Sequence, residues 1–191
     1  MATATENKVQ FNLLNVYYAI LTIPDGTPSW ATPVHIPGAV NLNLDEQGEI
    51  TKFYADGIVY YQSVANNGYS GDLEMARFPD QMMKDVWGLE EVQTDFVLIE
   101  KGNVQPKAFA LLFQIDGDQS NELYCMYNCT ATRPAIAGST NNETKEPKTQ
   151  TSTISAVSLE NNDIMARTTK QSPESVKSTW FKSVYQRTEG E

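Results

Sequence analysis

The sequence predicts a mainly β protein, an antiparallel sandwich or barrel with one flanking helix and one short C-terminal helix. Three observations support this fold class. Many short segments are rich in β-branched and aromatic residues, turn-forming residues bound these segments, and strands do not alternate regularly with helices. A length of 191 residues, 40% of them hydrophobic, is enough for a single domain with a substantial core.

The expected strands follow one another along most of the chain. They span residues 14–23, 39–44, 57–64, 68–77, 95–101, 108–115, 122–133 and 151–159. Turn tripeptides separate several of them, namely PDG at 24–26, ADG at 55–57, NNG at 66–68 and DGD at 116–118. Short strands joined by such turns favour antiparallel pairing.

The first helix is expected over residues 78–87. Pro79 suits the first helical position, Asp80 complements the positive end of the helix dipole, and Gly88 is a natural stop. The spacing of three and four residues predicts a buried face made of Met82, Met83, Val86 and Trp87.

A second helix is expected over about 173–186. Ser172 is placed as the N-cap and Pro173 lies in the first turn. Its apolar face would consist of Val176, Trp180, Phe181 and Val184. Both helices are too short to be stable alone, so they must pack on the sheet.

The two cysteines, Cys125 and Cys129, lie in an expected strand and would then face the same side. Four strand steps separate their α-carbons by roughly 13 Å, which is too far for a disulfide. With no histidine nearby they also make a poor zinc site, so we expect two small core residues.

Three segments look less regular, and within a single domain of residues 1–191 we expect them to be an N-terminal arm, an extended loop and a polar loop. The arm covers about 1–12, the proline-rich loop about 24–56, and the flexible polar loop about 133–150. The proline-rich loop contains Trp30, which looks exposed, in a stretch too apolar for a linker. Such a segment often contacts another molecule.

The charge argues against nucleic-acid binding. The chain has 24 acidic and 14 basic residues, a formal charge of −10, and no cluster of Lys and Arg to neutralise phosphates. The alternative explanation is that the acidity only keeps the protein soluble. No long apolar stretch or secretory signal is evident, so we expect no membrane association and a cytoplasmic site of synthesis.

The search for chemistry predicts no enzyme, no metal and no cofactor. His35 is the only histidine, and no nucleophile motif or metal-ligand pattern accompanies it. The stretch DGDQSNE at 116–122 begins like a calcium loop, but Asn121 and Tyr127 occupy the positions that require Gly and Glu. The two Asn-X-Thr triplets, at Asn128 and Asn142, carry no meaning without a secretory signal.

Taken together, the motifs resemble a known family. The resemblance runs in order through NKVQFNLLNVYYAILT, PVHIPGAVNLNLDEQGE, FYADGIVYYQSVANNGYSGDLEMARFPDQMMKDVWG, AFALLFQIDGD, YNCTATRP and STWFKSVY, from about Asn7 to Tyr185. This succession is similar to the major tail proteins of long-tailed, non-contractile phages (siphophages) that infect Gram-positive bacteria. No single motif is specific, whereas their joint order is.

The resemblance implies a structural virion protein whose hexameric rings stack into a tail tube, the conduit for genome delivery. It implies partners as well: further copies of the chain, a tape-measure protein, a tail-tip or baseplate complex, a tail terminator, and double-stranded DNA passing without specific binding. The expected location is the virion tail, with assembly in the host cytoplasm.

On that basis we expect particular residues to form the contacts of the tube. Contacts between rings or subunits are assigned to Trp30, Pro33, His35, Ile36 and Pro37. A lumen strand would contain Tyr69, Asp72 and Glu74. The helix with Met82, Met83, Val86 and Trp87 would flank the barrel.

Two other classes of function stay open at this point. A carbohydrate-binding β-sandwich module would explain the fold and the aromatic residues, but its Trp and Tyr should form an exposed platform. An enzyme is the least favoured reading, because one His and unpaired carboxylates provide no acid–base pair. Glycan binding or concentration-dependent polymerisation would discriminate between the two leading hypotheses.

Overall fold

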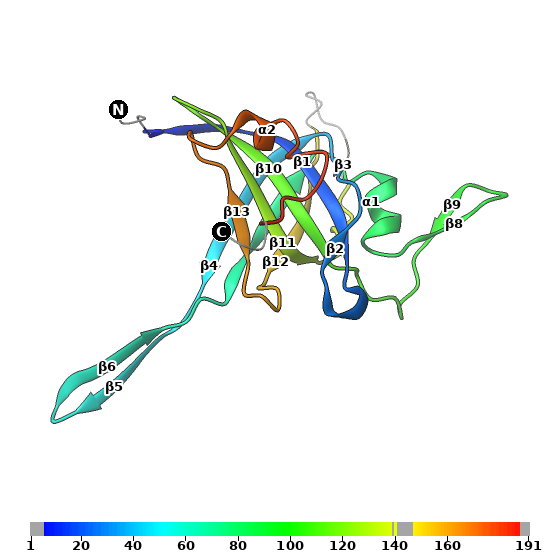
Figure 1. Cartoon of the computed structure of the whole chain (residues 1–191). Coiled ribbons are helices and arrows are strands. Elements are labelled where there is room, and N and C mark those ends of the chain that lie inside the picture. Colours follow the sequence, from blue (N-terminus) through cyan, green and yellow to red (C-terminus); the bar gives the residue numbers. More distant parts are fainter. Residues whose placement is uncertain (1–5, 139, 141–146, 188–191) are drawn as a thin grey trace.

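The computed structural model describes residues 6–138, 140 and 147–187, and these form a mainly β, antiparallel fold. The fold class predicted from the sequence is therefore confirmed. Six strands make the central sheet in the order β1 (Gln10–Thr22), β10 (Phe109–Gly117), β11 (Glu122–Ala131), β12 (Gln150–Ala156), β7 (Gly68–Met75) and β4 (Ala39–Gln47) (Figure 1).

Short strands extend this sheet along the two sides of its middle. β2 (Ser29–Trp30) and β3 (Val34–His35) pair with β1 on the side away from β10. β13 (Met165–Arg167) pairs with the first half of β11, while β12 pairs with the end of β11. One long strand is thus shared between two neighbours, which lets the sheet curve.

The curved sheet buries residues on both faces, which gives the two layers of a sandwich. The main core lies on one face of the sheet and includes Tyr18, Leu73, Phe109, Leu111 and Ile154. The second core lies on the opposite face of β1, β10 and β11, where the C-terminal segment covers it with Trp180 and Val184. Side chains that alternate along β10 enter the two cores in turn, because successive residues of a strand point to opposite faces.

The helix α1 (Asp80–Asp85) closes the main core, and it is shorter than the 78–87 expected. Met82, Val86 and Trp87 are buried in that core, and Met83 packs against it half-buried. Two hydrogen bonds tie this region to the sheet. The Tyr18 hydroxyl donates to Asp85 Oδ2 at 2.7 Å, and the Trp87 indole donates to the Ala131 carbonyl at 3.1 Å.

The C-terminal helix is also shorter than expected, because α2 covers Glu174–Lys177 where 173–186 was expected. The Thr179 hydroxyl donates to the Ser175 carbonyl at 3.0 Å, and the Ser178 hydroxyl to the same carbonyl at 3.2 Å. Hydroxyls that bond to nearby carbonyls compete with the helical hydrogen-bond ladder. The chain continues in turns that place Trp180 on the sheet, where its indole donates to the Tyr124 carbonyl at 3.2 Å.

Two β-bulges change which residues reach each core. In β1, Asn15 takes a φ of 50° and donates from Nδ2 to Gln114 Oε1 at 2.9 Å, so that Leu13 and Val16 both face the main core. In β11, three steps from Met126 to Cys129 oppose only two steps on β10. The extra residue reverses the alternation of side chains beyond it.

The second bulge corrects the expectation that the cysteines share a face. Cys125 lies in the second core and Cys129 in the main core, on opposite sides of the sheet. Both thiols are free and buried. Burial raises the pKa of the Cys129 thiol to about 12 and also raises the pKa of the Cys125 thiol.

Because thiolates are the reactive form, we expect both cysteines to resist alkylation in the folded protein. At pH 8, iodoacetamide should modify neither thiol within the time that it takes to modify both in denaturant. Mass spectrometry of the intact protein would measure this. Rapid labelling of either thiol without denaturant would contradict the burial of that residue.

Candidate assembly surfaces

The most prominent surface feature is a hairpin that projects far from the body of the molecule. It consists of β5 (Ile50–Ala55) and β6 (Ile58–Val64), which form a separate two-stranded sheet among the described residues (Figure 1). Asp56 and Gly57 form its turn with φ values of 51° and 76°. Positive φ at both central residues fits the twist of a two-residue hairpin, and the ADG motif predicted a turn at this place.

Both faces of the hairpin are apolar and exposed. The pairing places Phe53 beside Tyr61 on one face, and Tyr54 beside Val59 on the other. The large apolar residues exposed on the hairpin are Ile50, Phe53, Tyr54, Ile58, Val59, Tyr60, Tyr61 and Val64. An isolated two-stranded hairpin is marginally stable in water, and monomeric proteins seldom expose so much contiguous apolar surface. The hairpin therefore has the character of a contact surface.

The hairpin is a continuous extension of the β4–β7 pair. The Ala65 amide donates to the Glu49 carbonyl at 3.0 Å, and the Asn67 amide donates to the Gln47 carbonyl at 2.7 Å. A side chain at Gly48 would place its Cβ only 2.4 Å from the Ala65 carbonyl oxygen, so the two chains cross closely at this point. These bonds fix the direction in which the hairpin leaves the sheet.

A smaller hairpin projects beyond α1, formed by β8 (Glu90–Val92) and β9 (Val97–Ile99). Phe96, in its turn, is 77% exposed. Ion pairs hold its base, with Lys84 Nζ at 2.9 Å from Glu91 Oε2 and Lys101 Nζ at 2.6 Å from Glu90 Oε2. The hydrogen bond to Glu91 raises the pKa of Lys84 and keeps it charged. This hairpin is a second candidate contact surface.

The proline-rich segment differs from the exposed loop that was expected. Trp30 is half-buried against the second core and donates its indole N–H to the Tyr127 carbonyl at 3.0 Å. Ile36 and Pro33 are buried, whereas His35 and Pro37 are exposed. Residues 24–56 also contain strands β2 to β5. Of the residues assigned to intermolecular contacts, Trp30, Pro33 and Ile36 are covered by the chain itself. This leaves His35, packed on the Tyr17 ring, and Pro37 at the surface.

The three residues expected to line a lumen lie in β7 but not on one face. Tyr69 packs against the main core, on the side of Leu73 and Met75. Asp72 is exposed on the other side and accepts a hydrogen bond from the Thr153 hydroxyl at 2.7 Å, and Glu74 accepts one from the Thr149 hydroxyl. The two-residue period of a strand separates Tyr69 from the two acids.

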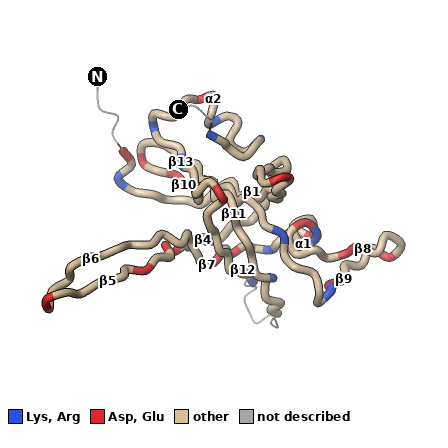
Figure 2. The backbone as a smooth tube through the Cα atoms, turned by 60° about the horizontal axis from the view of Figure 1, so that its bottom comes forward, with Lys and Arg blue, Asp and Glu red and all other residues tan. Residues whose placement is uncertain are grey.

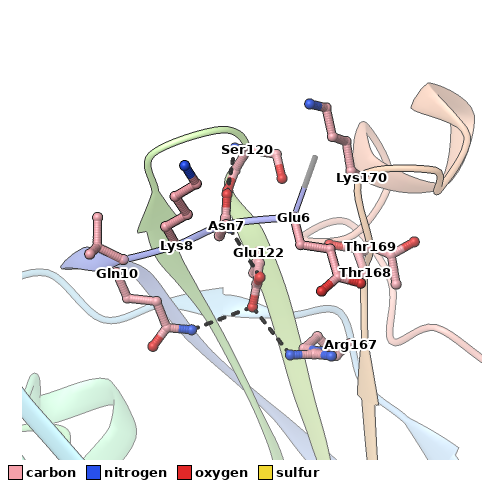
Figure 3. Close-up of a pocket in the computed structure, with 11 residues that line it drawn as sticks. Glu6, Asn7, Lys8, Gln10, Ser120, Glu122, Arg167, Thr168, Thr169 and Lys170 are labelled. Atoms are coloured by element: carbon pink, nitrogen blue, oxygen red, sulfur yellow. Dashed lines mark hydrogen bonds and ion pairs between the residues drawn. The ribbon is translucent and has the colours of Figure 1, made fainter. Parts of the chain in front are cut away.

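The N-terminal arm is clasped onto the turn between β10 and β11 (Figure 3). Asn7 Nδ2 donates to the Ser120 carbonyl at 2.7 Å and to Glu122 Oε1 at 3.0 Å, and Asn7 Oδ1 accepts from the Gln119 and Ser120 amides at 3.0 and 2.9 Å. Glu122 also faces Gln10 and Arg167, each at 3.5 Å. Polar side chains and backbone thus surround a cavity of about 430 Å³, and its hydrogen bonds fasten the arm.

We expect Asn7→Ala to loosen this arm without unfolding the protein. Four hydrogen bonds are lost, and at about 1 kcal/mol for each net bond the local opening should become at least tenfold more frequent. Trypsin cleavage after Lys8 would report the opening. Gln10→Ala is a matched control because, among the described residues, the Gln10 side chain makes only long hydrogen bonds of 3.5 Å. An equal increase in that variant would contradict the role of Asn7.

The clasp should also weaken in acid. The Lys8 amide donates to Asp118 Oδ1 at 2.8 Å and lowers the pKa of that carboxyl. A lowered pKa stabilises the clasp above the ordinary aspartate range near pH 4, and this stabilisation is lost as the pH falls through the lowered value. Hydrogen exchange of the Lys8 amide, followed by NMR between pH 6 and 2, should show the loss, and Asp118→Asn should remove that pH dependence.

Charge is dispersed over the molecule, and Figure 2 shows basic residues scattered and most of the β5–β6 hairpin uncharged. Among the described residues, no group of three or more His, Cys, Asp or Glu is placed to hold a metal ion. None of the helices in this part of the chain is long and apolar enough to cross a membrane.

The sequence pattern does not identify the most exposed candidate surface. It places the intermolecular contacts in the proline-rich segment and predicts residues 57–64 only as one more strand. A usable signal was present, because IVYY at 58–61 has no polar residue to give the alternation of a half-buried strand. This pattern indicates a strand that is covered on both faces, but it does not show whether the same chain or another molecule covers it.

The fold and its surfaces define a class: a mainly β, antiparallel protein with a curved sheet and unpartnered apolar arms. No protein-family model matches the chain, and no curated protein matches it. Among solved structures, it is similar to the tube-terminating cap of the anti-feeding prophage, determined by cryo-EM. The TM-score is 0.40 and the identity 17%, over 88% of this chain and 99% of that one. At these values the likeness implies nothing about function.

Proposed function

We propose that this chain is a structural virion protein, the subunit of hexameric rings that stack to form a phage tail tube. The observation that supports this most is the β5–β6 hairpin, whose large apolar side chains are exposed on both faces. An arm of this kind requires a partner, and further copies of the chain are the partner that a tube provides. The order of sequence motifs supports the same conclusion.

The charge fits a conduit for DNA. Each chain carries a formal charge of −10, so a ring of six would carry −60. An acidic wall repels phosphates and lets DNA pass without adhering, the opposite of a nucleic-acid-binding surface. In this proposal the tape-measure protein, a tail-tip or baseplate complex and a tail terminator are the companions. The protein would assemble in the host cytoplasm and reside in the virion tail.

The test is negative-stain electron microscopy of the purified protein at rising concentration, with sedimentation velocity on the same samples. Rings or tubes of uniform diameter with a central channel are the expected result, either spontaneously or after addition of a tail-tip complex. A monomer at every concentration, even with that complex, would overturn the proposal. Binding on a glycan array would then favour the carbohydrate-binding alternative, although all three Trp residues already pack within the chain.

A further inference from the structure

The last described segment of the chain, residues 169–187, lies on the sheet without being part of it (Figure 1). It consists of a turn, α2 and the turns that follow, and we refer to it as the C-terminal cover. Its amides at positions 172, 176–180, 182 and 183 donate to carbonyls of the cover itself. Because none of residues 169–187 belongs to a strand, the cover adds no rung to the hydrogen-bond ladder of the sheet.

Side chains attach the C-terminal cover to the sheet. Trp180 and Val184, 3% and 8% exposed, are the only buried residues among 169–187, and they pack in the second core. The Trp180 indole donates to the Tyr124 carbonyl at 3.2 Å, and the Phe181 ring stacks on Tyr17 with centroids 4.8 Å apart. An attachment through a few side chains can be released without disturbing the backbone pairing of the strands.

The root of the C-terminal cover is fixed firmly. Thr168 is 2% exposed, donates its amide to the Leu123 carbonyl at 2.9 Å and accepts from the Leu123 amide with Oγ1 at 3.0 Å. Residues 169–171, which follow, are exposed. At the other end Arg187 Nε lies 3.4 Å from Asp163 Oδ2, in an exposed ion pair of a kind that contributes little. Movement of the cover is therefore free to begin just after Thr168.

The C-terminal cover hides one apolar face of β10 and β11. Ala110, Leu112, Leu123, Cys125 and Tyr127 lie on this face, in the second core. The two strands are held together independently of the cover, because they pair with each other and bury their other face in the main core. Of the described residues that form the main core, none belongs to the cover.

We infer that the C-terminal cover is a lid that opens and closes as one unit on the folded sheet. A segment held by few buried contacts opens more easily than the core strands of the same protein. Opening separates Trp180, Phe181 and Val184 from the sheet but breaks no strand pair, so the main core persists. The open state uncovers an apolar face that the closed state withholds from other molecules. The lid is a property of the single chain, so it does not depend on tube formation.

Two native thiols report separately on the two faces of the sheet. Cys125 lies in the second core and Cys129 in the main core. Both are buried, so iodoacetamide reaches either thiol only while the structure around it is open. Opening of the lid exposes Cys125 alone, whereas global unfolding exposes both.

The test begins with slow alkylation of the wild-type protein at pH 8, under conditions in which sedimentation velocity shows a monomer. Iodoacetamide is kept dilute enough that the rate is proportional to its concentration, and tandem mass spectrometry assigns each adduct to Cys125 or Cys129. Without urea, we expect Cys125 to react at least tenfold faster than Cys129, though still far more slowly than in denaturant. The Cys125 rate should also rise less steeply with urea, because lid opening exposes less surface than global unfolding.

Three variants separate lid opening from global unfolding. Ile154→Val, in the main core, destabilises the closed and open states alike, so it should accelerate Cys129 by roughly two- to tenfold and leave Cys125 unchanged. Trp180→Phe removes the hydrogen bond to Tyr124 and destabilises only the closed state, so it should accelerate both thiols by the same factor. Phe96→Ala is the control, because Phe96 is exposed on the β8–β9 hairpin, and it should change neither rate.

Two results would overturn the lid. One is an equal rate and an equal urea dependence for the two wild-type thiols, which would mean that the C-terminal cover leaves only when the whole chain unfolds. The other is an Ile154→Val variant in which both thiols are accelerated equally. Both substitutions at these positions keep an apolar side chain in place, so each variant is expected to fold.

Discussion

A chain in which Phe53 and Tyr61 are both serine is expected to remain monomeric at concentrations at which the wild-type protein associates. Buried aromatic anchors of an interface typically contribute about 2 kcal/mol or more each when truncated, a factor of about 30 in affinity. The two side chains are neighbours on one face of the hairpin, so their effects will not simply add. Sedimentation equilibrium over a concentration series would measure the change.

The stability of the subunit should not change in this variant. Phe53 and Tyr61 are 59% and 62% exposed in the single chain, so their truncation removes little buried area. Ser63→Ala, on the same face of the hairpin, is the matched control and should assemble like the wild type. Normal assembly of the double-serine variant would show that this face is not a contact surface.

The largest expected effect on stability is that of Trp87→Ala. Trp87 is fully buried, packs edge-on against Phe78 with ring centroids 5.4 Å apart, and donates to the Ala131 carbonyl. Truncation of a buried Trp costs about 3–5 kcal/mol, and it leaves that carbonyl without its partner. Because a whole domain is stable by only about 5–15 kcal/mol, the variant should be marginally folded.

Urea denaturation followed by circular dichroism would measure this loss. Trp87→Phe should cost less, since it keeps an aromatic ring in the core and removes the hydrogen bond. Tyr60→Ala, on the exposed hairpin, controls for loss of an aromatic residue and should change the free energy of unfolding by less than about 0.5 kcal/mol. If Trp87→Ala unfolds at the wild-type urea concentration, Trp87 does not hold α1 on the sheet.

Aromatic residues have two opposite roles in this chain. Trp87 stabilises the subunit from within, whereas Phe53 and Tyr61 are exposed on a hairpin that projects from it. Truncation of Trp87 should prevent assembly because the subunit loses its fold. Truncation of Phe53 and Tyr61 should prevent assembly and leave the fold of the subunit intact.

Local patterns predicted most of the elements. Residues rich in β-branched and aromatic types became strands where turn motifs bounded them, and Met82, Val86 and Trp87 share a buried face because helical spacing is a local property. The DG pair at 56–57 forms the expected turn, because its backbone conformation depends on those two residues.

The sequence predictions failed for residues whose burial depends on a segment far away in the chain. The sequence pattern around the two cysteines predicts one face, but the bulge that places them in different cores depends on the register between β11 and β10. Trp30 looks exposed beside its prolines, yet it packs over the second core and bonds Tyr127, which lies 97 residues away in the chain. The C-terminal helix expected to continue to residue 186 ends at Lys177, and the turns that follow place Trp180 on β11.

By itself, the sequence determined the fold class, the approximate strands, the core face of α1 and the acidity, since composition and short-range spacing specify these. Only the tertiary structure decided which apolar strands are covered. β10 and β5–β6 are both apolar and rich in strand formers, but β10 lies between β1 and β11 while the hairpin extends beyond the last neighbours of its sheet. Burial is a relation between distant segments, so an apolar strand becomes core or contact surface according to what packs against it.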